Sequence, residues 1–134
     1  MKKLTLTAAF AQFGAELTNP RWQCSAIAKD GSLVVSCWSD ALKPGAGGHK
    51  RYEYSKSLWG EGNRPGRNRL WRHLRTAFDH SLPIRLVIAT LDRREDFHQA
   101  VTDASPLPKT FSTEPNLVGR VVEFDDERFA IEFR

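Results

Sequence analysis

Two alternating apolar runs that flank an Asp-Gly pair constrain the fold of this chain most strongly. The runs cover residues 22–28 and 33–38, and Lys29-Asp30-Gly31-Ser32 lies between them. Asp-Gly between such runs is a strong signal for a β-hairpin closed by a two-residue type I′ turn. In that register Cys24 lies directly opposite Cys37 on the apolar side. The two cysteines are interpreted as small, reduced core residues, and a redox or metal pair is the alternative.

Further runs predict additional strands of the same sheet. Residues 117–124 and 128–133 alternate around Asp125-Asp126-Glu127, which indicates a second hairpin. Residues 84–90 are almost continuously apolar, which is typical of a central strand. A short strand is expected at 51–55, with Tyr52 and Tyr54 on one side.

Four other segments carry turn or mixed patterns. Residues 40–50 and 56–66 are rich in glycine, and we expect both to be long loops. Residues 92–104 are charged and mixed, so a short helix and an irregular excursion both remain open. Residues 105–116 predict a Pro-rich loop with an edge strand at Lys109 to Ser112.

Helical spacing appears twice. The clearest helix is predicted from Arg67 to His80, and Pro83 follows its end. Its apolar positions are Leu70, Trp71, Leu74, Ala77 and Phe78. A short N-terminal helix is predicted from the spacing of Leu6, Ala9, Phe10 and Phe13, with Thr5 as N-cap and Gly14 as stop.

These elements predict an α+β fold in one domain spanning residues 1–134, built on a curved, mostly antiparallel sheet. The sheet would contain two hairpins and two or three further strands, with closure into a PUA-like barrel as one option. No window of 18 apolar residues and no secretion signal is evident, so we expect a cytoplasmic protein with no membrane association.

Basic residues are concentrated between Lys50 and Arg75. This segment holds eight Lys or Arg and two Glu, 8 − 2 = +6, whereas the whole chain carries +4. Localised arginine favours a polyanion, and nucleic acid is the first candidate. The alternative is a solvated helix flank with local ion pairs. The predicted phosphate contacts are Lys50, Arg51, Arg64, Arg67, Arg69, Arg72 and Arg75.

Aromatic residues near this segment predict a second kind of contact. Trp38 and Trp59 are the best candidates to stack on an unstacked base, because one lies on a polar hairpin face and the other in a glycine-rich loop. Trp22 and Tyr54 complete the candidate pocket, and Asn19 and Arg21 would order its mouth. The alternative is that these rings are core or loop anchors.

No residue set argues for catalysis. The four histidines are scattered, Asp125-Asp126-Glu127 falls at a hairpin turn, and no G-x-S-x-G elbow is present. The sequence therefore predicts neither a metal site nor a cofactor, and a hidden hydrolytic site stays an open alternative.

The motif Leu17-Thr18-Asn19-Pro20-Arg21-Trp22, followed by the Asp30-Gly31 hairpin and Trp38, resembles a small bacterial module. Its pattern is L-x-N-P-R-W-S-W-x-A and then D-G-x-V-x-L-x-V-W. Such modules occur at the N-terminus of some HNH restriction endonucleases, and also alone. The likeness continues through Gly66-Arg67-Asn68-Arg69, residues 85–90 and residues 118–120. Cys24 replaces the second Trp of the motif, and no HNH-type nuclease constellation follows.

This resemblance implies a DNA-directed module that recognises modified bases, without cleavage by the chain itself. We therefore expect a nucleic-acid-binding protein, with DNA or RNA as partner, acting beside a separately encoded nuclease. A protein-interaction module whose basic segment meets an acidic partner is the alternative. The oligomeric state does not follow from the sequence.

Overall fold

The computed structural model describes residues 4–20, 22–59, 63–92 and 109–134 of the chain. The strands are β1 (Ser25–Ile27), β2 (Leu33–Trp38), β3 (Leu42–Pro44), β4 (Lys50–Ser55), β5 (Ile84–Leu91), β6 (Lys109–Phe124) and β7 (Arg128–Phe133). The helices are α1 (Leu6–Ala11), α2 (Lys56–Trp59) and α3 (Arg64–His80), and Ser39–Ala41 and Ala46–Gly48 form short 3₁₀ turns.

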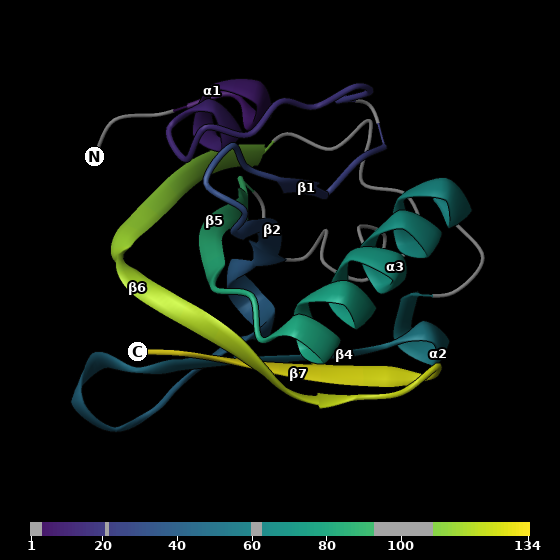
Figure 1. Cartoon of the computed structure of the whole chain (residues 1–134). Helices are drawn as coiled ribbons and strands as arrows, with labels where there is room; N and C mark the ends of the chain where they lie inside the picture. The colour runs from purple at the N-terminus through teal and green to yellow at the C-terminus, as the bar shows by residue number, and fades with distance from the viewer. Residues whose placement is uncertain (1–3, 21, 60–62, 93–108) are drawn as a thin grey trace.

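The strands form one sheet in the order β1-β2-β5-β6-β7-β4-β3 (Figure 1). Only β2 and β5 pair in parallel, so the expected α+β fold with a mostly antiparallel sheet is confirmed. The sheet curves because the first part of β6 pairs with β5 and its last part pairs with β7. It is open rather than closed into a barrel, with β1 and β3 at its edges. No helix in the described ranges has the length and apolar character needed to cross a membrane.

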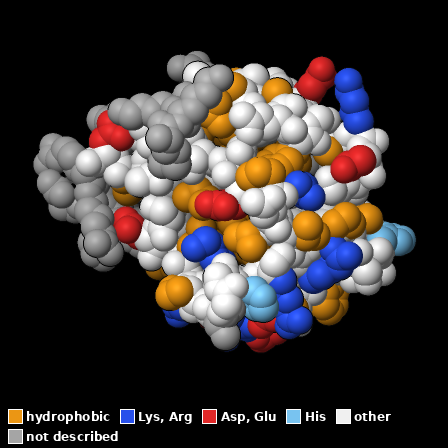
Figure 2. All heavy atoms as spheres, turned by 90° about the vertical axis from the view of Figure 1, so that its left-hand side faces the viewer, with side chains coloured by type: hydrophobic (Ala, Val, Ile, Leu, Met, Phe, Trp, Pro, Cys, Tyr) orange, Lys and Arg blue, Asp and Glu red, His pale blue; other side chains and the backbone are white. Residues whose placement is uncertain are grey.

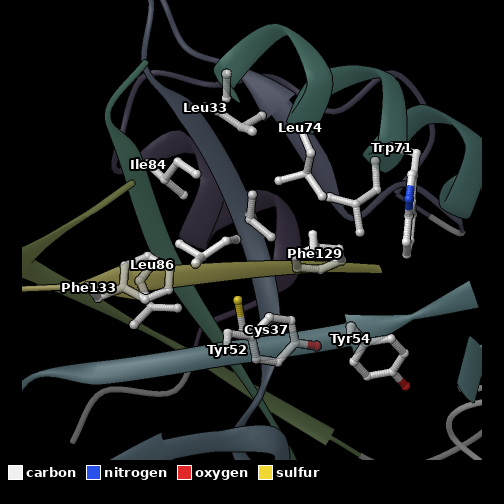
Figure 3. Packing of buried hydrophobic residues seen from close by; sticks show 14 residues of the cluster. Leu33, Cys37, Tyr52, Tyr54, Trp71, Leu74, Ile84, Leu86, Phe129 and Phe133 are labelled. Atoms are coloured by element: carbon white, nitrogen blue, oxygen red, sulfur yellow. The ribbon is translucent and has the colours of Figure 1, made fainter. Parts of the chain in front are cut away.

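The main core lies between α3 and one face of the sheet (Figure 3). Leu70, Trp71 and Leu74 of α3 are buried against strand residues that include Leu33 and Phe129. Each such side chain stabilises the fold by roughly 1.5–3 kcal/mol relative to exposure. The predicted stripe is confirmed except at Phe78, which is 43% exposed.

The opposite face of the sheet is covered by α1, and the predicted N-cap of this helix is confirmed. Thr5 accepts a hydrogen bond from the backbone N–H of Ala8 at 3.1 Å. Phe10 is fully buried and packs in a second cluster with Val34 and Val87. Strands β2 and β5 are therefore buried on both faces, which explains why β5 is almost continuously apolar.

The first hairpin forms, but its predicted register is wrong by one residue. Ser25 pairs with Val35, and the backbone of Cys24 pairs with Ser36 rather than Cys37. The loop has three residues, 29–31, because Gly31 adopts a left-handed φ of +89° after a turn. The Asp30 carboxylate fixes this loop by accepting bonds from the N–H and hydroxyl of Ser32, at 2.9 and 2.6 Å. Since side chains alternate across a strand, the shift turns Ser25 toward α3.

The C-terminal hairpin of β6 and β7 confirms the prediction, but β6 is longer than expected. It continues through Pro115, where a loop was predicted. Its pairing with β5 is irregular between Thr113 and Val118, so the missing N–H of proline breaks no ladder bond there. The charged segment 93–104 and the start of the Pro-rich segment, 105–108, lie outside the described residues.

The two glycine-rich segments are less irregular than predicted. Residues 40–50 contain β3, which pairs with β4 to form a two-stranded ribbon, the β3–β4 ribbon. Residues 56–66 contain α2 and the first turn of α3. Helix α3 begins at Arg64, three residues before the predicted start, because Asn63 caps it by accepting a bond from the N–H of Gly66.

Candidate nucleic-acid interface

The exposed side of α3 carries the densest positive charge in the described chain. Its 17 residues include five Arg and one Asp, 5 − 1 = +4, which equals the formal charge of the whole chain. Arg64, Arg72 and Arg75 are exposed. At 100° per residue these three positions fall within about 80° of the helix circumference. We call these three residues the arginine face.

Arg67 and Arg69 flank the arginine face and are half-buried. The guanidinium of Arg67 lies 3.4 Å from the Asn68 side-chain oxygen. That of Arg75 lies 3.6 Å from the Asp126 carboxylate, and both of these side chains are largely exposed. An exposed ion pair of this length contributes little, so Arg75 can exchange it for a phosphate.

Trp22 extends the arginine face on the side of Arg69. The Arg69 guanidinium carbon lies 5.0 Å from the centre of the half-buried Trp22 ring, and Arg69 also donates a 3.2 Å bond to the Thr18 hydroxyl. Such stacking of a cation on an indole is favourable and orients both groups. This brings one of the predicted stacking residues together with the predicted phosphate contacts.

A buried glutamine orders the turn that presents Trp22. The side-chain oxygen of Gln23 accepts bonds from the backbone N–H groups of Thr18 and Asn19 and from the Thr18 hydroxyl, at 2.9, 3.2 and 3.0 Å. Its side-chain nitrogen donates to the Ser25 carbonyl at 2.8 Å. Asn19 thus belongs to this turn through its backbone, while Arg21 lies outside the described residues.

The first turn of α3 docks against the same segment through Asn63, which no sequence pattern singled out, and Gly66, which begins the motif likeness in this helix. Asn63 donates a 2.9 Å bond to the Trp22 carbonyl. A Cβ at Gly66 would lie 2.3 Å from that carbonyl oxygen, so only glycine permits this approach. Asn before a Pro-Gly helix start is a cap signal, but its tertiary partner has no signature in the sequence.

A second tie joins α3 to β1. The Ser25 hydroxyl lies 2.7 Å from Nδ1 of His73. Burial, together with Arg69 and Arg72, lowers the pKa of His73 to about 4, so the imidazole is neutral at pH 7. Ser25 is fully buried, so this pair offers no accessible nucleophile and instead holds the hairpin against the helix.

The other predicted stacking residues contribute to packing. Tyr54 is buried, and Trp59 meets Tyr54 and Trp71 edge-on, with ring centres 5.8 and 6.3 Å apart. Trp38 packs against the main core. Figure 3 shows Tyr54 and Trp71 lying along one side of that core. The rings of Trp38, Trp59 and Tyr54 thus pack in or against the main core.

Arg51 is also engaged elsewhere, contrary to its predicted role in phosphate binding. Its guanidinium contacts the carboxylates of Glu53, Glu123 and Glu132, each at 2.5 Å. Hydrogen bonding to Glu53 is the main cause that raises the pKa of Arg51. Each of its three guanidinium nitrogens contacts one of these carboxylates, so we leave Arg51 out of the arginine face.

Lys50 lies away from α3 as well. The turn of the β3–β4 ribbon is at the lower left of Figure 1, whereas α3 begins at the right. Figure 2, viewed from the left-hand side of Figure 1, shows basic side chains beside a histidine at the lower edge, at the height of this turn. The basic segment thus divides into two surfaces, one on α3 and one at the ribbon.

The described residues place neither a reactive thiol nor a metal-binding cluster beside the arginine face. Burial raises the pKa of the Cys24 thiol to about 12, and Cys37 is buried with a raised pKa, so both are unreactive thiols. Within the described ranges no three His, Cys, Asp or Glu gather to hold a metal ion. Asp125 accepts bonds from backbone N–H groups in its own turn, and Glu127 accepts one from the backbone N–H of Ser57 at α2.

No protein-family model, no curated protein and no solved structure matches this chain.

Proposed function

We propose that this chain binds nucleic acid through the arginine face of α3. The observation that carries the proposal is the concentration of a +4 charge on one helix whose opposite side is buried. From Arg64 to Arg75 the helix advances about 17 Å. That length matches roughly five phosphates along one strand at 3.4 Å each.

Trp22 supplies a contact of a different kind in this proposal. Arg69 covers the ring, and the half-buried indole can extend that stack onto an unpaired or modified base. Gln23 and Asn63 hold the backbone around Trp22, so little ordering entropy is lost on binding. DNA is the favoured partner because of the motif around Trp22.

The proposal assigns no reaction to the chain itself. Any effect on DNA would come through a separately encoded nuclease, in keeping with the resemblance to endonuclease-associated modules. A cytoplasmic location belongs to the same proposal, and the two free thiols support it.

The test is the salt dependence of oligonucleotide binding, measured by fluorescence anisotropy with single- and double-stranded DNA. We expect log K to fall linearly with log salt. The double variant Arg72→Ala/Arg75→Ala should reduce the magnitude of that slope by roughly 2, about 1 for each arginine that no longer neutralises a phosphate. The matched control is Lys29→Ala/Arg120→Ala, which removes the same charge from exposed positions away from α3.

The control variant should keep the slope of the unmodified chain. No binding at low salt, or equal losses in both double variants, would contradict the proposal. In the first case an acidic protein becomes the better candidate partner for α3.

A further inference from the structure

A second contact between an arginine and an aromatic ring lies at the C-terminal end of α3. The guanidinium carbon of Arg75 is 5.6 Å from the centre of the Phe124 ring, where β6 ends. Phe78 lies against the same ring, with ring centres 6.1 Å apart. Figure 1 shows the last turns of α3 beside the end of β6. Phe78 is exposed and Phe124 is half-buried, so the two rings present aromatic surface to solvent. We call them the phenylalanine pair.

Helical spacing connects the phenylalanine pair with Trp22. Four residues of α3 follow one another at intervals of three, and we call them the helix row: Arg69, Arg72, Arg75 and Phe78. Residues three apart are neighbours on a helix surface, so the row runs obliquely across the exposed side of α3. Arg69 covers the Trp22 ring at 5.0 Å, at the other end of the row. Three arginines therefore lie between two aromatic surfaces, along about 14 Å of helix.

This composition indicates what can cover the helix row. An apolar protein surface would bury the guanidinium groups without partners, which costs free energy. A duplex keeps its bases inside the stack, so it would offer no base face to the rings. A single strand meets both requirements, because its phosphates can contact the arginines and its unstacked bases can contact the rings.

Two carboxylates modify the charge at the phenylalanine pair. Asp79 follows Phe78 and is exposed. Asp126 lies 3.6 Å from the Arg75 guanidinium, and its side chain is 91% exposed. These acids reduce the positive potential at this end of the helix row. Stacking should therefore supply most of the contact at the phenylalanine pair, and Arg72 should supply more of the phosphate attraction.

We propose that the helix row binds single-stranded nucleic acid, with one base on Trp22 and another on the phenylalanine pair. Arg72 and Arg75 hold the phosphates between them. At 3.4 Å for each nucleotide, the row spans roughly four nucleotides. Stacking on aromatic rings tolerates every base, so little sequence preference is expected. This inference rests on the proposed function and narrows its partner from nucleic acid in general to an unpaired strand.

The experiment measures fluorescence anisotropy of three labelled probes with the whole chain at fixed ionic strength. The probes are a single-stranded oligonucleotide, the same strand annealed to its complement, and a strand of equal length whose sugars carry no bases. We expect the single strand to bind more tightly than the duplex. It should also bind at least about tenfold more tightly than the strand without bases, which has the same phosphates but nothing to stack.

Variants of Phe78 test the stacking contact. Phe78→Leu keeps an apolar side chain but removes the ring, so it should weaken single-strand binding at least about fivefold, as expected for one stacked base. Its affinity for the strand without bases should not change. Phe78→Tyr keeps the ring and should keep the affinity. The matched control is Val118→Ala, which alters an exposed apolar residue six positions before Phe124 in β6 and should leave binding of all three probes unchanged.

Thermal unfolding verifies that each variant is folded. The inference is overturned if the three probes bind equally, or if Phe78→Leu keeps the full affinity for the single strand. Salt-dependent binding that Arg72→Ala/Arg75→Ala weakens would in those cases still support the proposed function, whereas no binding of any probe overturns both. If Phe78→Leu changes the sedimentation of the free chain but not its affinity for the strand, the phenylalanine pair is a contact between copies of the chain, and the inference fails.

Discussion

Gly66 shows how one residue decides the position of the whole arginine face. Helix propensity alone predicts that Gly66→Ala stabilises the protein by about 1 kcal/mol. The close approach to the Trp22 carbonyl opposes this, because the new Cβ would lie 2.3 Å from its oxygen and 2.6 Å from the Asn63 side chain. Backbone cannot yield as a flexible side chain does, so we expect a net loss of about 1–3 kcal/mol.

Urea denaturation measures this loss, and Asn68→Ala provides the control. Asn68 is exposed in the same helix, so its replacement changes helix propensity without a clash and should gain up to about 0.5 kcal/mol. Weaker DNA binding by Gly66→Ala should accompany its lower stability, because the contact between Trp22 and Arg69 depends on this docking. A Gly66→Ala variant more stable than the unmodified chain would contradict the role assigned to the glycine.

At the scale of elements, the segments with one clear period could be predicted from the sequence. Helix α3 and strand β7 each have one strongly apolar side, so periodicity identifies them. The register of β1 and β2 could not be predicted in this way. Leu33, Val34 and Val35 are all fully buried, so alternation does not distinguish the two faces. The local bond from Asp30 to Ser32 decides the loop instead.

The candidate site likewise has a part that could be predicted from local sequence patterns and a part that could not. The arginine face follows from helical spacing, because it depends only on positions within α3. The roles of Asn63, Gly66 and His73 depend on contacts with a segment about 40–50 positions away in sequence, and no local pattern encodes such contacts. The packing of Trp38 and Trp59 against the core could not be predicted, because sequence cannot distinguish an exposed indole from one at the edge of a core.

Arg51 joins three strands, and its removal tests whether it supports the sheet or binds nucleic acid. Arg51→Gln leaves the carboxylates of Glu53, Glu123 and Glu132 close together without their shared cation. We expect a loss of about 1–2 kcal/mol at pH 7, since like charges on neighbouring strands repel.

The control for Arg51 is Arg120→Gln, which removes an exposed arginine opposite Glu132 in the ladder. Its effect on stability should stay within about 0.5 kcal/mol. Oligonucleotide affinity at pH 7 should change less than twofold in Arg51→Gln. A tenfold weaker affinity with unchanged stability would return Arg51 to the set of phosphate contacts.

For the whole molecule, the carboxylates with lowered pKa values make stability fall on acidification. Hydrogen bonds lower the pKa values of Asp30, Glu53, Asp125 and Glu127 in the folded state. For each, the unfolded chain binds a proton at higher pH than the folded chain does. Their stabilisation is therefore present above the ordinary pKa values of 3.8 and 4.5 and is lost as pH falls through the lowered ones.

His73 extends this loss to milder pH. Its pKa falls from 6.5 to about 4 on folding, so between these values the unfolded chain binds the proton and the folded chain does not. Stability should consequently decline from pH 6.5 to pH 4, by about 1–3 kcal/mol after allowance for partial exposure. Urea denaturation across this range measures the decline.

The variant His73→Gln keeps a polar group facing Ser25 but cannot titrate, so it should flatten the plot of unfolding free energy against pH above pH 5. His80→Gln removes an exposed imidazole from the same helix and should keep the decline. A curve that is unchanged by His73→Gln would show that protonation of this half-buried ring does not oppose folding, and that the tie between β1 and α3 tolerates a charged imidazole.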